Sequence, residues 1–284
     1  MIIVDMNQVM IANLMAQIGN HTNIELEESL LRHMVLNSIR NFKLKFGDDY
    51  GELVFACDDK KYWRKDYYPY YKAHRKKARE KSELDWTHIF KTLNKIKQEL
   101  IDNFPYKIIQ IEGAEADDII GTLCNTYSTE ENTILILSAD KDFVQLQTNI
   151  NVSQYDPIRK RWIKHEDPVS YLQEHIARGD RGDGIPNVLS RDDCFVRGRQ
   201  KPLRKKMLDE ILSTEKLVSP IINEEITRNW IRNQTLIDLN CTPEDIKKQV
   251  IDTYINTNVN QRDKLFNYFV QHKLKNLMEH IGEF

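Results

Sequence analysis

The chain has 284 residues, of which 40% are hydrophobic and 30% are charged, and its formal net charge is −2. This composition is ordinary for a globular protein with room for one large domain or two. No apolar run approaches the roughly 18 residues of a membrane span, and no secretory leader is present, so we expect a cytoplasmic protein. The four cysteines lie far apart and include no Cys-x-x-Cys pair, which favours free thiols over disulfides or a zinc site.

The small net charge conceals two strongly basic segments. Residues 60–81 contain ten Lys or Arg and only two acids, and residues 197–206 contain six basic residues and no acid. Many of the remaining acids are concentrated where hydrophobic runs end. Basic flanks around an acidic pocket suit a polyanion that is held by its backbone while metal ions act on one phosphate.

The first part of the chain alternates strand-like and helix-like patterns, which predicts a parallel sheet with helices on both faces. Helical spacing of apolar residues is found in residues 30–42, 84–103 and 115–127. The stretch 152–163, with Asp156-Pro157 near its centre, is typical of a hairpin. The predicted strands are 1–5, 52–57, 107–111 and 133–138.

After about residue 178 the strand pattern fades and helical patterns take over. We therefore predict an α/β domain over residues 1–178 and a smaller α-helical domain over residues 179–284. Neither a repeat nor a low-complexity linker separates them, so we expect the two parts to pack together. The predicted helices of the second part are 207–212, 221–239, 243–251 and 261–281.

Acidic residues follow the predicted strands repeatedly. Because the carboxyl ends of parallel strands meet at one edge of an open sheet, these acids should converge in one crevice. So many carboxylates would repel one another strongly unless cations neutralised them, which predicts a divalent-metal site. The nine acids are Asp5, Asp58, Glu115, Asp117, Asp118, Asp140, Asp142, Asp180 and Asp183.

Each acidic motif also has a simpler interpretation. Glu115-Ala-Asp117-Asp118 begins a predicted helix, where acids are common caps and where Glu115 and Asp118 share a face. Asp140-Lys-Asp142 can supply neighbouring oxygen ligands, or one cap and one solvated acid. The Gly-Asp pairs near residue 180 are ordinary turn sequences. The joint pattern decides in favour of metal binding, because chance rarely ends every strand of a sheet in acid.

The segment 62–79 interleaves aromatic side chains with cations. Lys and Arg neutralise phosphates and tyrosine rings stack on unpaired bases, so this segment predicts a contact with single-stranded nucleic acid. A solvated helix is the alternative, but the few acids leave few salt-bridge partners for it. No phosphate-binding glycine loop, His-Glu-x-x-His or Gly-x-Ser-x-Gly motif is present, and the eight histidines show no ligand spacing.

With these residues identified, the chain resembles the flap endonuclease or 5′-nuclease superfamily, and within it the ribonucleases H of T-even-type bacteriophages, over nearly its whole length. The resemblance rests on an ordered set of motifs: Ile3-Val-Asp5, Asp58 followed by Tyr62-Trp-Arg-Lys, Tyr71-Lys-Ala-His-Arg75, Glu115-Ala-Asp-Asp118, Ser138-Ala-Asp-Lys-Asp142, Gly179-Asp-x-x-Asp183 and the tail Glu283-Phe284.

The resemblance implies a PIN-like 5′-nuclease fold with a helical arch at about residues 60–82, and a divergent helix–two-turn–helix in the C-terminal domain. It implies a Mg²⁺-dependent 5′-3′ nuclease of DNA replication that removes RNA primers and 5′ flaps from branched or nicked DNA and RNA–DNA hybrids. Two Mg²⁺ ions, for which Mn²⁺ can substitute, would act together. The first would be held by Asp5, Asp58, Glu115 and Asp117 and the second by Asp140, Asp142 and Asp183, with Asp118 and Asp180 in support.

The resemblance also assigns roles to basic residues. Lys72 and Arg75 match residues of the family's arch that would steady the scissile phosphate, and Tyr71 would stack on the terminal base. The chain departs from the family after Asp183, where Gly184 replaces an Asn and a longer basic stretch follows, so a potassium site is not expected. The predicted nucleic-acid contacts are Arg64, Lys65, Tyr71, Lys72, Arg75, Lys76, Arg197, Arg199, Lys201, Arg204, Lys205 and Lys206.

We expect a monomer, with a single-stranded DNA-binding protein or a sliding clamp as its replisome partner. One alternative is a PIN-type ribonuclease, although such domains are usually shorter and lack the arch. The other is a haloacid-dehalogenase-type phosphatase, which Gly179-Asp-x-x-Asp183 faintly resembles. That family needs an acid two residues after its nucleophilic Asp, and here Asn7 occupies the place.

Overall fold

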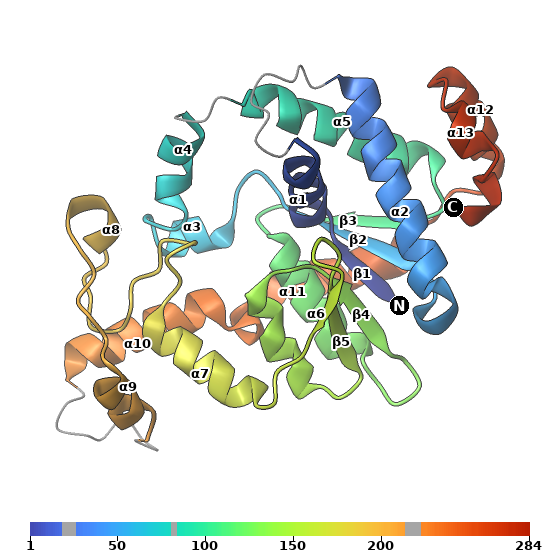
Figure 1. Ribbon diagram of the computed structural model, residues 1–284. Coiled ribbons are helices and arrows are strands. Elements are labelled where there is room, and N and C mark those ends of the chain that lie inside the picture. Colours follow the sequence, from blue (N-terminus) through green and yellow to red (C-terminus); the bar gives the residue numbers. More distant parts are fainter. Residues whose placement is uncertain (19–26, 81–83, 214–222) are drawn as a thin grey trace.

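The computed structural model describes residues 1–18, 27–80, 84–213 and 223–284. Its centre is one six-stranded sheet with the strand order β3-β2-β1-β4-β5-β6 (Figure 1). The first five strands are parallel, and β6 closes the edge as the antiparallel partner of β5. The strands are β1 (Ile2–Asp5), β2 (Leu53–Cys57), β3 (Lys107–Gln110), β4 (Ile134–Leu137), β5 (Val152–Asp156) and β6 (Arg161–Ile163).

Three helices cover one face of the sheet: α1 (Met6–Ile18), α2 (Glu28–Tyr50) and α5 (Trp86–Asn103). Their apolar residues form one core cluster with alternate residues of the strands. The C-terminal helices α12 (Asp263–Gln271) and α13 (Lys275–Met278) join this cluster. The last residue, Phe284, is buried and its ring packs edge-on against those of Phe104 and Phe269.

The other face is covered by α6 (Ala116–Tyr127), the 3-10 helix η1 (Lys141–Thr148) and α11 (Glu244–Asn256). Apolar residues of all three pack with Ile3, Ile109 and Ile136 from the sheet in a second core cluster. Both layers of the α/β fold therefore contain helices from the C-terminal part of the chain.

The remaining elements lie beside the carboxyl ends of the strands (Figure 1). Two short helices, α3 (Trp63–Tyr67) and α4 (Ala73–Glu80), occupy the segment predicted as an arch. The C-terminal part contains α8 (Cys194–Arg197), α9 (Lys205–Leu212) and α10 (Glu224–Ile237). Helix α7 (Pro168–Arg178) contacts η1 and also packs against α9 and α10.

The sequence predicted the strands, the hairpin and the helix after residue 115 correctly. Helices α1 and α7 were not predicted, and residues 221 and 222 of the predicted helix 221–239 lie outside the described part of the chain. The prediction of one helix over 261–281 is wrong, because Lys273 adopts φ +55° and separates α12 from α13. All four cysteines are free thiols, as predicted.

Candidate metal centre and nucleic-acid interface

The predicted acids meet at the point where the strand order reverses. Strand β1 lies between β2 and β4, and the connections from these strands run to opposite faces of the sheet, which leaves a crevice at their carboxyl ends. Asp5 is the last residue of β1, Asp58 follows β2, and Asp140 caps η1 just after β4. The local sequence explains this placement, because Asp5 and Asp58 directly follow buried apolar residues and Asp140 comes after Ser138 and Ala139 at the end of β4.

Backbone and amide donors fix the acids on the β1–β2 side. Asp5 accepts hydrogen bonds from the Gln8 amide (3.1 Å) and the Ser138 hydroxyl (3.2 Å). Asp58 accepts from the Ala116 amide (2.8 Å), at the start of α6, and from the Asn7 side chain (3.0 Å). These donors orient both carboxylates toward the crevice. Asn7 is a residue whose part in the site the sequence alone did not reveal.

Burial and mutual repulsion raise the pKa values of four acids of the site, which makes these four hard to ionise. Burial, reinforced by the charges of Asp58 and Asp140, raises the pKa of Asp5 to about 8. Burial also raises the pKa of Asp117 well above its usual value, with Asp140 as the next cause. The pKa values of Asp140 and Asp142 are raised by burial and by neighbouring carboxylates in the same way. Groups that resist ionisation without a counter-charge are what a cation-binding site requires.

The donor atoms fit a hard divalent cation. Carboxylate oxygens are the preferred ligands of Mg²⁺ and Mn²⁺. In addition, Asp142 Oδ1 is buried and accepts no hydrogen bond from any described residue, although buried polar atoms almost always have a partner. A bound cation would satisfy this oxygen. The site is therefore a candidate metal centre.

Asp118 faces the protein interior. Its side chain has no exposed surface and accepts hydrogen bonds from Arg64 Nη1 (2.8 Å), Thr242 Oγ1 (2.7 Å) and the indole of Trp63 (3.2 Å). It also completes a capping box at the start of α6 with Glu115. Burial raises its pKa, but the charge of Arg64 outweighs this and holds the pKa below its usual value. Asp118 can therefore support the metal ligands only indirectly.

Asp180 shapes the loop that presents Asp183. Its Oδ1 accepts hydrogen bonds from the Gly182 amide (2.6 Å) and the Asp183 amide (3.3 Å), and its Oδ2 lies 2.9 Å from Lys141 Nζ. The same loop packs against the arch, where the Lys72 amide donates to the Asp183 carbonyl (2.7 Å). Gly184 has φ +75°, and a Cβ there would lie 3.0 Å from the Tyr70 carbonyl oxygen, which explains why glycine occupies this position.

Cations from the arch reach the acids directly. Lys72 Nζ lies 2.6 Å from Glu115 Oε1 and 3.5 Å from Asp183 Oδ2, and Arg75 Nη2 lies 2.6 Å from Asp183 Oδ1. The hydroxyl of Tyr71 donates toward both carboxylates, at 2.8 and 2.9 Å. The site therefore combines anionic groups that can hold cations with cationic groups that can hold a phosphate.

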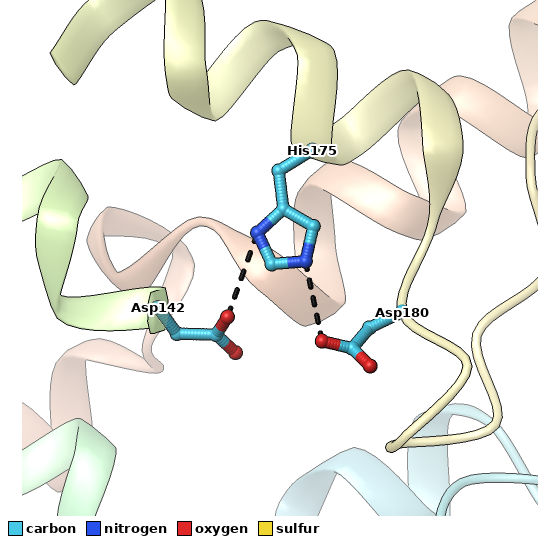
Figure 2. Close-up of side chains that lie close together, drawn as sticks. All are labelled: Asp142, His175 and Asp180. Atoms are coloured by element: carbon cyan, nitrogen blue, oxygen red, sulfur yellow. Dashed lines mark hydrogen bonds and ion pairs between the residues drawn. The ribbon is translucent and has the colours of Figure 1, made fainter. Parts of the chain in front are cut away.

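A histidine that the sequence did not single out lies in the same place. His175, on α7, has its ring between Asp142 and Asp180 (Figure 2). These three residues place one ligand atom each within 4.8 Å of one another, a spacing that could hold a metal ion. Asp180 is a local partner of His175, but Asp142 meets the ring only through the packing of α7 on η1, so spacing alone did not reveal this group.

The predicted nucleic-acid contacts divide into exposed and buried residues. Arg64 is 1% exposed and binds Glu115, Asp118 and the Leu236 carbonyl, so in this structure it braces the site and offers no surface to a strand. Tyr71 is buried as well, which leaves its ring unavailable for base stacking here. Lys65 is exposed, with its amine 4.6 Å from the Tyr62 ring, and the side chain of Lys76 lies outside the described part of the chain.

The second basic segment runs from the end of α8 to the first turn of α9 and is exposed along most of this length. All six of its predicted contacts are exposed, and several of them line a hollow of about 290 Å³ beside Ser190 and Cys194. The six exposed residues are Arg197, Arg199, Lys201, Arg204, Lys205 and Lys206.

No described helix is long and apolar enough to cross a membrane.

Comparisons with known proteins agree with this architecture. Residues 1–175 match the 5′-3′ exonuclease N-terminal resolvase-like domain, and residues 170–284 match the C-terminal domain of T4 RNase H. The chain is 32% identical to ribonuclease H of Enterobacteria phage T4, over 99% of this chain and 95% of that protein. It is also 28% identical to a 5′-3′ exonuclease of Buchnera aphidicola, over 54% of this chain and 53% of that protein.

Solved structures share the fold at low sequence identity. The T5 5′-exonuclease with bound zinc ions aligns with a TM-score of 0.62 and 16% identity, over 90% of this chain and 98% of that one. The bacteriophage T5 flap endonuclease in a complex with DNA and metal ions aligns with a TM-score of 0.61 and 17% identity, over 89% and 97%. Nothing in these comparisons supports the phosphatase alternative. The chain belongs to the 5′-3′ exonuclease family that includes ribonuclease H of phage T4, and it is a hydrolytic nuclease.

Proposed function

We propose that this nuclease uses Mg²⁺ to remove RNA primers and 5′ DNA flaps during replication. The observation that carries the proposal is that acids from five segments of the chain gather beside the carboxyl ends of the strands, with the arch cations Lys72 and Arg75 next to them. The name of the phage T4 relative, ribonuclease H, and the DNA and metal ions in the T5 complex support this substrate class and this cofactor.

Two groups of acids would hold the ions. Asp5, Asp58, Glu115 and Asp117 would hold the first ion and Asp140, Asp142 and Asp183 the second, while Asp118 and Asp180 would keep these ligands in place. A pair of Mg²⁺ ions, or Mn²⁺ in their stead, would supply a hydroxide near neutral pH and neutralise charge on the phosphate and the leaving oxygen.

The protein's own cations would complete the reaction site. Burial lowers the pKa of Lys72, but the charges of Asp183 and Glu115 outweigh this and keep the ammonium protonated. With Glu115 and Asp183 engaged as metal ligands, Lys72 and Arg75 would be free to turn to the scissile phosphate. There they would stabilise the charge that builds up on the phosphate oxygens as the bond breaks.

The substrate would be gripped outside the reaction site by its phosphates. The exposed basic segment from the end of α8 to the first turn of α9, within the α-helical region 179–284, suits the duplex, and Lys65 with the arch suits the single strand. Such contacts position the backbone without reading sequence, as removal of primers and flaps of any sequence requires. We propose that the protein acts as a monomer in the cytoplasm, with a single-stranded DNA-binding protein or a sliding clamp as its replisome partner.

Cleavage of two substrates by an Asp140→Asn variant tests the proposal. A labelled RNA–DNA hybrid and a 5′-flap duplex are incubated with and without Mg²⁺, and binding is measured separately. The variant should bind both substrates almost normally and cleave neither, because it loses an anionic ligand but no phosphate contact. The exposed Asp48→Asn variant on α2 serves as the matched control and should cleave normally. Mg²⁺-dependent turnover by Asp140→Asn near the control rate would refute the proposal.

A further inference from the structure

His175 is buried between two carboxylates of the site but has no role in the mechanism above. It is 7% exposed, on the last turns of α7. Its Nε2 lies 3.2 Å from Asp180 Oδ2 and its Nδ1 lies 3.5 Å from Asp142 Oδ1 (Figure 2). Each ring nitrogen therefore faces one acid, and each acid comes from a different segment of the chain.

The surroundings of Asp180 decide which ring nitrogen carries the proton. Its Oδ2 lies 2.9 Å from the ammonium of Lys141, and its Oδ1 accepts hydrogen bonds from the backbone amides of Gly182 and Asp183, so these partners all donate to a carboxylate. An ionised carboxylate can only accept hydrogen bonds, so His175 Nε2 must donate to it. In the neutral ring, Nδ1 then has a lone pair that points at Asp142. The hydrogen bond to Asp180 fixes this tautomer and the orientation of the ring.

The lone pair of Nδ1 meets an oxygen that needs a partner. Asp142 Oδ1 is buried and accepts no hydrogen bond from the described residues. Two acceptors that face each other are unfavourable unless a proton or a cation lies between them. Two ligand atoms bound at about 2.1 Å to one ion lie about 3.0–3.4 Å apart, close to the 3.5 Å found here. An imidazole oriented by a carboxylate on its far nitrogen is a common arrangement around protein-bound metals.

We propose that His175 Nδ1 is a divalent-metal ligand beside Asp142, so that the second metal position is a mixed nitrogen–oxygen site. This inference rests on the proposed function and adds a ligand to its metal centre. Because imidazole binds transition-metal ions better than it binds Mg²⁺, His175 should strengthen Mn²⁺ and Co²⁺ binding more than Mg²⁺ binding. Asp180 then acts as a positioning residue that holds the imidazole toward the ion.

Pulsed EPR of bound Mn²⁺ tests the ligand directly. The full chain is loaded with Mn²⁺ without substrate, and nitrogen coupling to the ion is recorded. The wild type should show coupling from a coordinated ¹⁴N, which changes to ¹⁵N coupling when only the histidines are labelled with ¹⁵N. His175→Gln should lose this coupling and bind Mn²⁺ on the order of tenfold more weakly, with a smaller change for Mg²⁺. His33→Gln, on α2 at the other face of the sheet, is the matched control.

The isotope experiment does not depend on any variant folding correctly. Mn²⁺ that binds to the wild type without histidine nitrogen coupling would overturn the assignment of His175, while the carboxylate site and the nuclease proposal would stand. Absence of Mn²⁺ binding by the wild type would overturn both. Nitrogen coupling that persists unchanged in His175→Gln would assign the signal to another histidine and would also overturn the inference.

Discussion

The buried acids of the candidate metal centre should destabilise the metal-free protein, and Asp5→Asn should relieve part of this cost. Asn is nearly isosteric with Asp and can keep both hydrogen bonds of the site. Its carbonyl oxygen can accept from the Gln8 amide, and its amide can donate to Ser138 Oγ. The substitution therefore removes a charge from the crevice and leaves its packing unchanged.

The size of the effect follows from the raised pKa of Asp5, about 8 in the fold against an ordinary value of 3.8. At pH 7 the folded protein must keep this carboxyl protonated, whereas the unfolded chain ionises it freely. Each pH unit between the ordinary pKa of the unfolded carboxyl and pH 7 adds about 1.4 kcal/mol to the cost. This gives an upper limit of about 4 kcal/mol of lost stability. The penalty is small near pH 4, where the carboxyl of the unfolded chain is only partly ionised, and grows as the pH rises toward 8.

Thermal unfolding in EDTA at pH 4.5 and pH 7.5 measures this penalty. The variant should melt higher than the wild type at pH 7.5, by up to roughly 7 °C for a chain of this size, and almost equally at pH 4.5. Added Mg²⁺ should reverse the order, because it stabilises the wild type more. Asp48→Asn, on the exposed surface of α2, should show neither effect. A variant that melts no higher than the wild type in EDTA at pH 7.5 would refute the reasoning.

Three other substitutions probe separate parts of the site. Arg64→Met should lower the free energy of unfolding by about 3–5 kcal/mol in denaturant titrations, because it leaves the buried charge of Asp118 without its cationic partner. The control Lys65→Met should change the free energy of unfolding by less than about 0.5 kcal/mol. Lys72→Met should tighten Mg²⁺ binding, measured by calorimetry, because it removes the ammonium that occupies the acids. The same variant should slow turnover on DNA and RNA–DNA alike, because that ammonium would also steady the phosphate. A loss of activity confined to one nucleotide sequence would contradict this prediction. Replacing Arg197 and Lys201 by Gln should flatten the dependence of log Kd on log salt by about one unit per lost phosphate contact, and an unchanged slope would exclude these residues from the interface.

The sequence was informative where local chemistry decides structure. Short buried strands of Val, Ile and Leu followed by acids predicted the sheet and its crevice, since side chains at the ends of parallel strands must meet. The acids at Glu115 and Asp118 predicted the start of α6, because such residues cap the first turn of a helix. These features depend on residues within one or two turns of each other, so no tertiary information was needed.

The sequence was misleading where tertiary packing decides the role of a residue. Spacing placed Glu115 and Asp118 on one face of the predicted helix. In the fold Asp118 turns inward to Arg64, while Asp117 interacts with Asp140 across the crevice. Arg64 belongs to a basic segment and yet is buried, because α10 offers it the Leu236 carbonyl from 172 residues away. His175 meets Asp142 only through the packing of α7 on η1, which no local sequence pattern predicts.

The C-terminal region also contributes to the core and the metal centre, and a fragment of residues 1–178 should not fold alone. Truncation would remove Thr242 from Asp118 and the Leu236 carbonyl from Arg64, so a buried ion pair would lose partners on both sides. It would also uncover α6, where Ile246 and Val250 complete the second core cluster, at a cost of about 1.5–3 kcal/mol for each such side chain. Circular dichroism melts of the fragment should lack the cooperative transition of the full chain. A fragment that melts cooperatively near the full-length temperature would show that the helices after residue 178 bind substrate without supporting the site.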